Sequence, residues 1–360
     1  MTQNGRQPAA QRLIPVPPGP FAYAKVNRYD ALSGGRMQRR QFITVLGGIS
    51  AGLVWPLSSS AQKPMRRIGV LVIGNTDADA LSFQAELREE LRKSGYADGQ
   101  NLAFELRSAE QKLDLLPKLA AELVALKVDV IVALYTPCAL AAKQATREIP
   151  IVVVSGDPVG TGLVPSLAQP GGNVTGVSLV AAEMHGKCVE LFRDMLPSLR
   201  RVGAVVNAAD PFFKFVLEQV QLAGKTSNIE IAPIVMVRGS QEIEAALASV
   251  KKEEAGAVVV QASLASKQVA DLALRHGLPA ATVPRSFAEA GGTLSYGADS
   301  STSFRQSARF VTKILQGGLP ANMPVEQPTK FELVINLKTI KALGLKITEP
   351  FLLRADAILE

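Results

Sequence analysis

Side chains that commonly carry catalysis are sparse in this 360-residue chain. The two histidines, His185 and His276, stand far apart, and no His-Glu-x-x-His or Cys-x-x-Cys motif brings metal ligands together. The glycines between residues 156 and 162 lack the spacing of a dinucleotide loop or a Walker motif. We therefore expect no enzyme, no cofactor and no metal ion, and turn to residues that could bind a molecule without changing it.

Polar and aromatic residues follow the apolar runs that predict buried strands. In α/β sheets a ligand cleft lies beyond the carboxyl ends of the strands, where helix starts offer N–H groups and partial positive charge that favour an anion. In the first half of the chain, the candidate ligand contacts are Asn75, Thr76, Tyr135, Thr136 and Asp157. In the second half they are Asn207, Phe212, Ser263 and Tyr296.

Most of these candidates have a structural alternative. Thr76 and Thr136 could cap the helices that follow them, because a threonine hydroxyl satisfies the free N–H groups of a first turn. Asp157 could pair with a ligand ammonium or form a turn. Phe212 and Tyr296 could pack between two parts of the molecule instead of contacting a ligand.

Alternating strand and helix patterns position the candidates. Continuous apolar runs predict strands buried on both faces, and apolar residues three or four apart predict helices. The predicted strands cover residues 68–73, 102–106, 128–133, 151–154, 171–180, 202–206, 229–235, 257–261 and 280–283, and the predicted helices cover 80–91, 111–126, 137–147, 182–195, 211–224, 240–253 and 265–275. This order implies right-handed parallel crossovers. The expected fold class is therefore α/β, with two doubly wound, Rossmann-like lobes.

The two runs of α/β units meet near residues 175–185, which predicts a cleft between two lobes. We expect the first lobe to comprise residues 66–180 and about 294–320, and the second to comprise residues 181–293 and about 325–360. The chain is expected to return to the first lobe near Leu294 to Tyr296, after the turn at Gly291 and Gly292. Several crossings between the lobes would form a hinge.

Residues 37–61 have the composition of an export signal. Two arginines, Arg39 and Arg40, precede an apolar run of about sixteen residues, shorter than the roughly twenty that a membrane span needs. Small residues before Gln62 suit a cleavage site. The route is either the twin-arginine pathway or the ordinary Sec pathway. Residues 1–36 are rich in proline and glycine and are expected to be disordered or an extension upstream of the true start at Met37.

The basic balance of the chain belongs mostly to this leader. Residues 1–61 hold seven of the 39 Lys and Arg residues and one of the 32 Asp and Glu residues, which leaves 32 basic and 31 acidic residues in the rest. The rest of the chain therefore has no charge excess that would favour nucleic-acid binding.

Five stretches resemble a known family. They are GYADGQN at 95–101, DPVG at 157–160, PGGNVTGVS at 170–178, GGTLSYG at 291–297 and VINLK at 334–338. Residues 66–360 thereby resemble the bacterial ABC transporter substrate-binding protein family, related to tryptophan- and tyrosine-type binding proteins. One departure is that Tyr135 stands where many relatives have a small residue.

The resemblance implies a type I periplasmic binding fold whose lobes close on a small solute and deliver it to an ABC permease and ATPase at the inner membrane. The expected solute is an aromatic or other amino acid or a carboxylate. No lipid-anchor cysteine follows the signal, so we expect a free periplasmic protein. We also expect a monomer that does not bind nucleic acid.

Two other functions remain open. A cofactor-free amino-acid racemase would place one thiol on each lobe, and Cys138 lies at a helix start where a thiolate is stabilised, but Cys188 falls inside a predicted helix. We expect two partly buried, unbridged thiols. The effector lobe of a transcription regulator shares the fold, but it needs a DNA-reading headpiece where this chain has an export signal.

Overall fold

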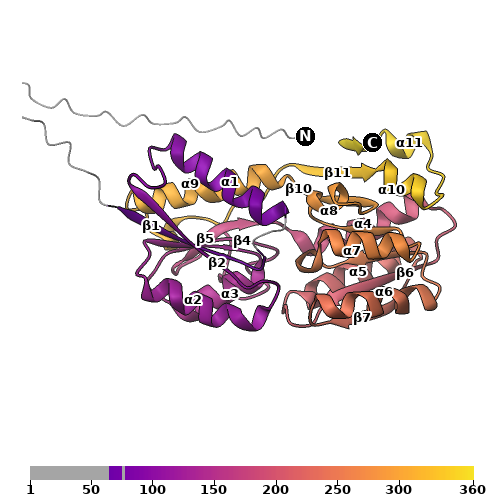
Figure 1. Cartoon of the computed structure of the whole chain (residues 1–360), viewed down its shortest axis with the longest axis horizontal. Coiled ribbons are helices and arrows are strands. Elements are labelled where there is room, and N and C mark those ends of the chain that lie inside the picture. The colour runs from indigo at the N-terminus through magenta and orange to yellow at the C-terminus, as the bar shows by residue number, and fades with distance from the viewer. Residues whose placement is uncertain (1–64, 75–77) are drawn as a thin grey trace, which may run out of the picture. The chain divides into compact units, whose positions relative to one another are not determined.

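The structure is a computed structural model that describes residues 65–74 and 78–360 (Figure 1). The predicted extension, the export signal and the candidates Asn75 and Thr76 lie outside these residues. Within residues 65–74 and 78–360, the helices all fall short of the length and apolar character that a membrane span requires.

The first sheet is parallel, with the strand order β2-β1-β3-β4-β5. Its three central strands are built from apolar residues and are almost wholly buried, because helices cover both faces of the sheet. The strands are β1 (Arg66–Val72), β2 (Leu102–Ser108), β3 (Val130–Leu134), β4 (Ile151–Ser155) and β5 (Val174–Ser178).

Two pairs of helices cover this sheet. α1 (Ala78–Lys93) and α9 (Ser300–Leu315) pack on one face, where the rings of Phe83 and Phe304 meet edge to face at 5.2 Å. α2 (Leu116–Ala125), preceded by a 3-10 turn at Leu113–Leu115, and α3 (Thr136–Ala145) pack on the other face (Figure 1). The first lobe is this sheet with its four helices.

The second sheet has the strand order β12-β11-β10-β9-β8-β6-β7, and its pairs are parallel except for β10 with β11. The order β7-β6-β8-β9-β10 repeats that of the first sheet. The strands are β6 (Arg201–Asn207), β7 (Glu230–Val237), β8 (Ala257–Val260), β9 (Ala280–Thr282), β10 (Leu294–Ala298), β11 (Phe331–Asn336) and β12 (Ala357–Leu359). The expectation of two doubly wound lobes is confirmed.

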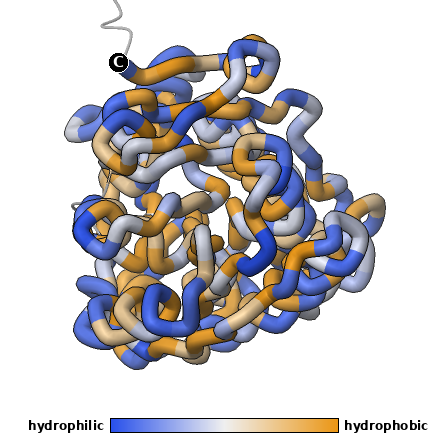
Figure 2. The backbone as a smooth tube through the Cα atoms, turned by 90° about the vertical axis from the view of Figure 1, so that its right-hand side faces the viewer, coloured by the Kyte–Doolittle hydropathy of each residue, from blue (hydrophilic) through white to orange (hydrophobic). Residues whose placement is uncertain are grey.

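Helices also cover both faces of the second sheet. One core forms under α4 (Ala181–Met195) and α5 (Phe213–Ser227), and another under α6 (Ile243–Lys252), α7 (Lys267–Arg275) and α8 (Arg285–Glu289). The remaining elements are the helices α10 (Leu337–Ala342) and α11 (Glu349–Leu352) and 3-10 turns at Ser240–Glu242, Ala262–Leu264 and Pro320–Asn322. In Figure 2, hydrophobic segments run through the interior and hydrophilic ones gather in the outer turns.

Within the described residues, the chain crosses between the lobes three times. The first crossing joins β5 to α4 through Leu179 and Val180, and the second joins β10 to α9. The third follows Glu326, whose backbone still pairs with β5, and leads to β11. Val180 has φ 53° and ψ 36°, a left-handed conformation that costs a β-branched residue roughly 1–2 kcal/mol.

One predicted boundary is wrong. Leu294 to Tyr296 belong to β10, which pairs with β9 and β11 in the second sheet, so they do not return the chain to the first lobe. Gly291 and Gly292, read from the sequence as a connection between lobes, close the end of α8, since their N–H groups bond to the carbonyls of Ala288 and Phe287. The return is made by α9.

The two cysteines are buried and are not joined by a disulfide. Cys188 lies inside α4, and burial raises the pKa of its thiol to about 12. Unbridged thiols agree with the prediction, although both are more deeply buried than expected.

Candidate functional site

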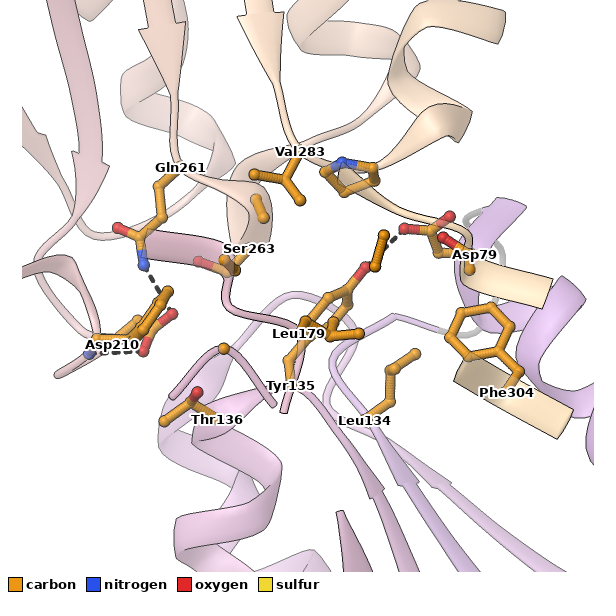
Figure 3. A pocket seen from close by; sticks show the side chains of 17 residues that line it. Asp79, Leu134, Tyr135, Thr136, Leu179, Asp210, Gln261, Ser263, Val283 and Phe304 are labelled. Atoms are coloured by element: carbon orange, nitrogen blue, oxygen red, sulfur yellow. Dashed lines mark hydrogen bonds between the residues drawn. The ribbon is translucent and has the colours of Figure 1, made fainter. Parts of the chain in front are cut away.

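The carboxyl ends of the strands of both lobes surround a cavity, which we call the inner cavity (Figure 3). Its wall comes from the ends of β3, β4 and β5 in the first lobe and from the ends of β6, β8, β9 and β10 in the second, because parallel strands present these ends on the same edge of a sheet. The lining residues are Asp79, Leu134, Tyr135, Thr136, Gly156, Leu179, Ala181, Asp210, Phe212, Gln261, Ala262, Ser263, Val283, Pro284, Ala298, Ser300 and Phe304.

The inner cavity is small and opens towards a wider space. The volume that the centre of a water molecule can occupy in it is about 40 Å³, enough for a few waters, since one needs roughly 10–15 Å³ on this measure. A neighbouring outer cleft has about 610 Å³ on the same measure and shares Asp79, Tyr135, Ala262 and Ser263 with the inner cavity. A solute of amino-acid size therefore requires the lobes or side chains to move apart.

Tyr135 and Asp79 stand where the two spaces meet. The Tyr135 hydroxyl donates a hydrogen bond of 2.6 Å to Oδ2 of Asp79. Tyr135 has φ 71° and ψ 157°, a backbone conformation that costs a residue with a side chain on the order of 1–3 kcal/mol. Its N–H bonds to the Val154 carbonyl, which holds the residue at the end of β3. This backbone conformation directs the side chain to the boundary of the inner cavity and the outer cleft, and Tyr135 lines both spaces.

Burial raises the pKa of the Asp79 carboxyl above its ordinary value. Hydrogen bonds from Tyr135 and from Ser286, a residue of α8 in the second lobe, offset part of this effect, and the negative charge of Glu289 adds to it. Asp79 thus belongs to the first lobe, and its carboxyl contacts Ser286 of the second lobe.

Thr136 begins α3 and is 2% exposed. Pro137 follows it in the first turn, where a missing N–H removes no helical hydrogen bond. The Thr136 hydroxyl lies at the positive end of a ten-residue helix, an arrangement that favours a carboxylate or another anion.

In the second lobe a hydrogen-bonded network holds Asp210. Its Oδ1 accepts the Phe212 N–H at 3.0 Å, and its Oδ2 accepts Nε2 of Gln261 at 2.8 Å. Gln261 in turn accepts the Asn207 N–H at 2.9 Å through Oε1. Burial raises the pKa of Asp210 to about 6, although these donors and the neighbouring Ser263 hydroxyl lower it. The network orients the carboxyl but contains no cationic group.

Phe212 makes a close contact between the lobes. A Cβ placed on Gly156, at the end of β4, would fall inside the contact distance of the Phe212 ring, with the ring's Cε2 atom 2.8 Å away. Glycine at position 156 therefore allows the ring to lie directly on the backbone of the first lobe.

The structure brings some of the predicted site residues together and separates others. Tyr135, Thr136, Phe212 and Ser263 line the inner cavity, and Asn207 lines the outer cleft. These contacts concern the protein alone, so ligand binding by these residues stays a prediction.

Asp157 and Tyr296 line neither space. Oδ1 of Asp157 accepts the N–H groups of Val159 at 3.1 Å and Gly160 at 2.9 Å, which is the turn-forming role. Tyr296 stacks on Phe331 with ring centroids 6.4 Å apart and packs against the core of the second lobe.

Sequence analysis missed Asp79, Asp210 and Gln261. Asp79 lies three residues after the candidate Thr76 in the sequence, Asp210 lies three residues after Asn207, and Gln261 was taken as the last residue of a strand. Asp210 could have been found, because it is an acid three residues after an apolar strand, at the edge of the sheet where ligand contacts were expected. How deeply Asp79 is buried depends on its contact with Ser286 of α8, and no local sequence pattern connects these two residues.

The groups that a racemase would need lie elsewhere. Neither Cys138 nor Cys188 lines the inner cavity or the outer cleft. His185 is buried in α4, its Nε2 accepts the Ala262 N–H at 3.1 Å, and burial lowers its pKa to about 4, so it serves as a neutral structural group. In residues 65–74 and 78–360, no group of three or more His, Cys, Asp and Glu side chains could hold a metal ion.

Comparisons with known proteins agree with this arrangement. A family model described as "ABC transporter substrate binding protein" matches residues 67–359. The tyrosine-binding protein of Clostridioides difficile (strain R20291) is 27% identical over 259 residues, which cover 71% of this chain and 74% of that protein.

Solved structures show the same fold. A conserved domain protein from Vibrio cholerae superposes with a TM-score of 0.77 at 28% identity and covers 82% of this chain and 99% of that one. A domain from Streptococcus pneumonia, solved in complex with L-Trp, superposes with a TM-score of 0.75 at 24% identity and covers 82% of this chain and all of its own. The fold is the type I periplasmic binding fold that the sequence resemblance implied.

Proposed function

Because the chain belongs to the ABC transporter substrate-binding protein family, we propose that it is the extracytoplasmic subunit of an ABC importer and binds a small solute in the inner cavity. The observation that carries this proposal is the composition of the cavity wall. Tyr135 and Thr136 come from strand ends of the first lobe, and Phe212 and Ser263 come from strand ends of the second. A solute that contacts both sets stabilises the closed arrangement of the lobes.

Closure is a shift between two populations of the same chain. A solute shifts the balance only by the difference between its affinities for the closed and open forms. The three crossings between the lobes restrict their relative motion to a hinge, and the permease recognises the closed form. The contact between Phe212 and Gly156 forms when the lobes meet.

The solute is an amino acid or a related carboxylate. The start of α3 at Thr136 suits the carboxylate, and the unpaired acid Asp210 suits an ammonium group. The names of two relatives, a tyrosine-binding protein and a domain solved with L-Trp, support an amino acid as the class of solute. Asn75 and Thr76, which follow the residues of β1 in the sequence, remain predicted contacts.

The protein acts outside the cytoplasm as a monomer. Residues 37–61 carry the features of an export signal, with either the twin-arginine or the Sec pathway as the route. The partners are the permease and ATPase of the importer. Fractionation of cells that express the full chain tests the location, and a protein that stays in the cytoplasm with its leader uncut would contradict it.

Binding is tested by thermal unfolding of the purified chain against amino acids and carboxylates. A ligand present at a hundred times its Kd stabilises the folded state by about 2.7 kcal/mol, which is a measurable rise in Tm. Mass spectrometry of the protein as purified then identifies any solute that it retains. No rise in Tm across the panel, together with turnover of an amino acid, would favour the racemase instead.

A further inference from the structure

We propose, on the premise of the function above, that the solute carries two positively charged nitrogen groups, one received by Asp210 and the other by Asp79. Basic amino acids and linear diamines both have this chemistry. The inference goes beyond the amino acids named for the relatives, whose side chains are uncharged.

The charged residues found in the described wall of the inner cavity are all acidic. Among the described residues that line it, two are acids, Asp79 and Asp210, and none is a lysine, arginine or histidine. Among the ion pairs of residues 65–74 and 78–360, none involves either acid. Buried acids are usually paired with a cation or a metal ion, because an unpaired buried charge is costly. A solute can supply the missing charge.

Asp210 is oriented to receive a cation. Oδ1 accepts the Phe212 N–H at 3.0 Å, Oδ2 accepts Nε2 of Gln261 at 2.8 Å, and the neighbouring Ser263 hydroxyl also favours the charged form. A carboxylate offers about four acceptor positions, so the group keeps capacity for a further donor. Fixed neutral donors hold the group in place without neutralising it.

Asp79 is the acid at the side of the inner cavity opposite Asp210. Among the described residues, the charged neighbour that affects its pKa is another acid, Glu289, so these surroundings add negative potential. Lys267, the basic residue in the wall of the outer cleft, is engaged by Asp271 at 2.7 Å. The Tyr135 hydroxyl reaches Asp79 at 2.6 Å but carries no charge.

The space between the two acids is mainly apolar. Figure 3 shows Asp210 at one side of the cavity and Asp79 at the other, with Leu179 and Tyr135 between them. Leu134, Val283 and Phe304 complete the apolar wall. Polar ends joined by an apolar middle match a solute whose two nitrogens are separated by methylene groups.

Solutes without a second positive group fit less well. A monocarboxylate would add negative charge beside two acids, and an amino acid with an uncharged side chain would leave one acid without a counter-charge. The raised pKa values of both acids are consistent with a free protein that holds protons there, which a cationic solute would displace.

Isothermal titration calorimetry of the full chain tests the inference with six compounds: L-arginine, L-lysine, 1,5-diaminopentane, L-tyrosine, L-tryptophan and benzoate. We expect at least one of the first three to bind at least tenfold more tightly than each of the last three. The diamine separates the contribution of the two nitrogens from that of the carboxylate.

Three variants accompany the titrations. Asp79→Asn and Asp210→Asn should each weaken binding of the dicationic compound at least tenfold, while Asp114→Asn, at an exposed acid that lines neither space, should leave it unchanged. Thermal unfolding of each variant verifies that it folds.

The possible outcomes separate the inference from the function. Tighter binding of tyrosine, tryptophan or benzoate, or binding of the cations that Asp79→Asn does not weaken, would overturn the two-cation inference and leave the solute-binding function intact. Absence of binding for all six compounds would overturn the two-cation inference, and the thermal unfolding panel would then decide the solute-binding function separately.

Discussion

Replacement of Asp210 by asparagine changes how the stability of the solute-free protein depends on pH. Burial raises the pKa of Asp210 from its ordinary value of 3.8 to about 6 in the folded chain. A raised pKa means that the folded state holds the proton more tightly than the unfolded state. The stabilisation that this proton gives is complete below pH 3.8 and is lost as the pH rises through about 6.

The size of this loss follows from the difference between the two pKa values. At about 1.4 kcal/mol per pKa unit, ionisation of Asp210 removes about 3 kcal/mol of folding free energy between pH 3.5 and pH 7.5. Asparagine does not ionise, so Asp210→Asn lacks this loss. It also exchanges an acceptor for a donor opposite Nε2 of Gln261, which costs about 1–2 kcal/mol at every pH.

Urea unfolding of both proteins at a series of pH values measures the effect. The difference in unfolding free energy between the wild type and Asp210→Asn should shift by about 3 kcal/mol in favour of the variant between pH 3.5 and pH 7.5. The constant cost of the altered hydrogen bond cancels in this comparison. A difference that does not change with pH would show that Asp210 is not buried as an unpaired acid, and would refute the reasoning.

Three further predictions concern the cavity and the hinge. Gly156→Ala should weaken solute binding at least tenfold, because its Cβ meets the Phe212 ring. The control Gly172→Ala, whose added Cβ has no atom within 4 Å, should leave the affinity measured by calorimetry unchanged. If the two variants bind the solute with equal affinity, the closure contact is contradicted. Tyr135→Phe should lower the unfolding free energy at pH 7 by about 1.5–3 kcal/mol through loss of the bond to Asp79, and urea unfolding without that loss would argue against it. Val180→Asn should raise Tm, since asparagine relieves up to about 1 kcal/mol of left-handed strain; a lower Tm would contradict this.

The fold could be predicted well because its signals are local. The apolar runs of β1, β3 and β4 and the helical spacing of α1 place elements within a few residues of their observed bounds. The return of the chain could not be placed in this way. A pair of glycines has the same local pattern whether it ends a helix or joins two lobes, and only the pairing of β10 with β9 decides between them.

The site was predicted in part for a related reason. Tyr135, Thr136, Phe212 and Ser263 follow strands directly, and strand ends converge in this class of sheet. Asp79 reaches the cavity from the first turn of a helix and meets Ser286 from the other lobe. Contacts between distant segments of this kind leave no periodic trace in the sequence.

Closure of the lobes around a solute is the central claim, and a distance measured between them tests it most directly. Spin labels on Lys118→Cys in α2 and Glu244→Cys in α6 report that distance, because both positions are exposed while Cys138 and Cys188 are buried. Pulsed electron resonance should show a shift to shorter distances when the solute that raises Tm is added at saturation. A distribution that stays the same with the solute bound would contradict the account.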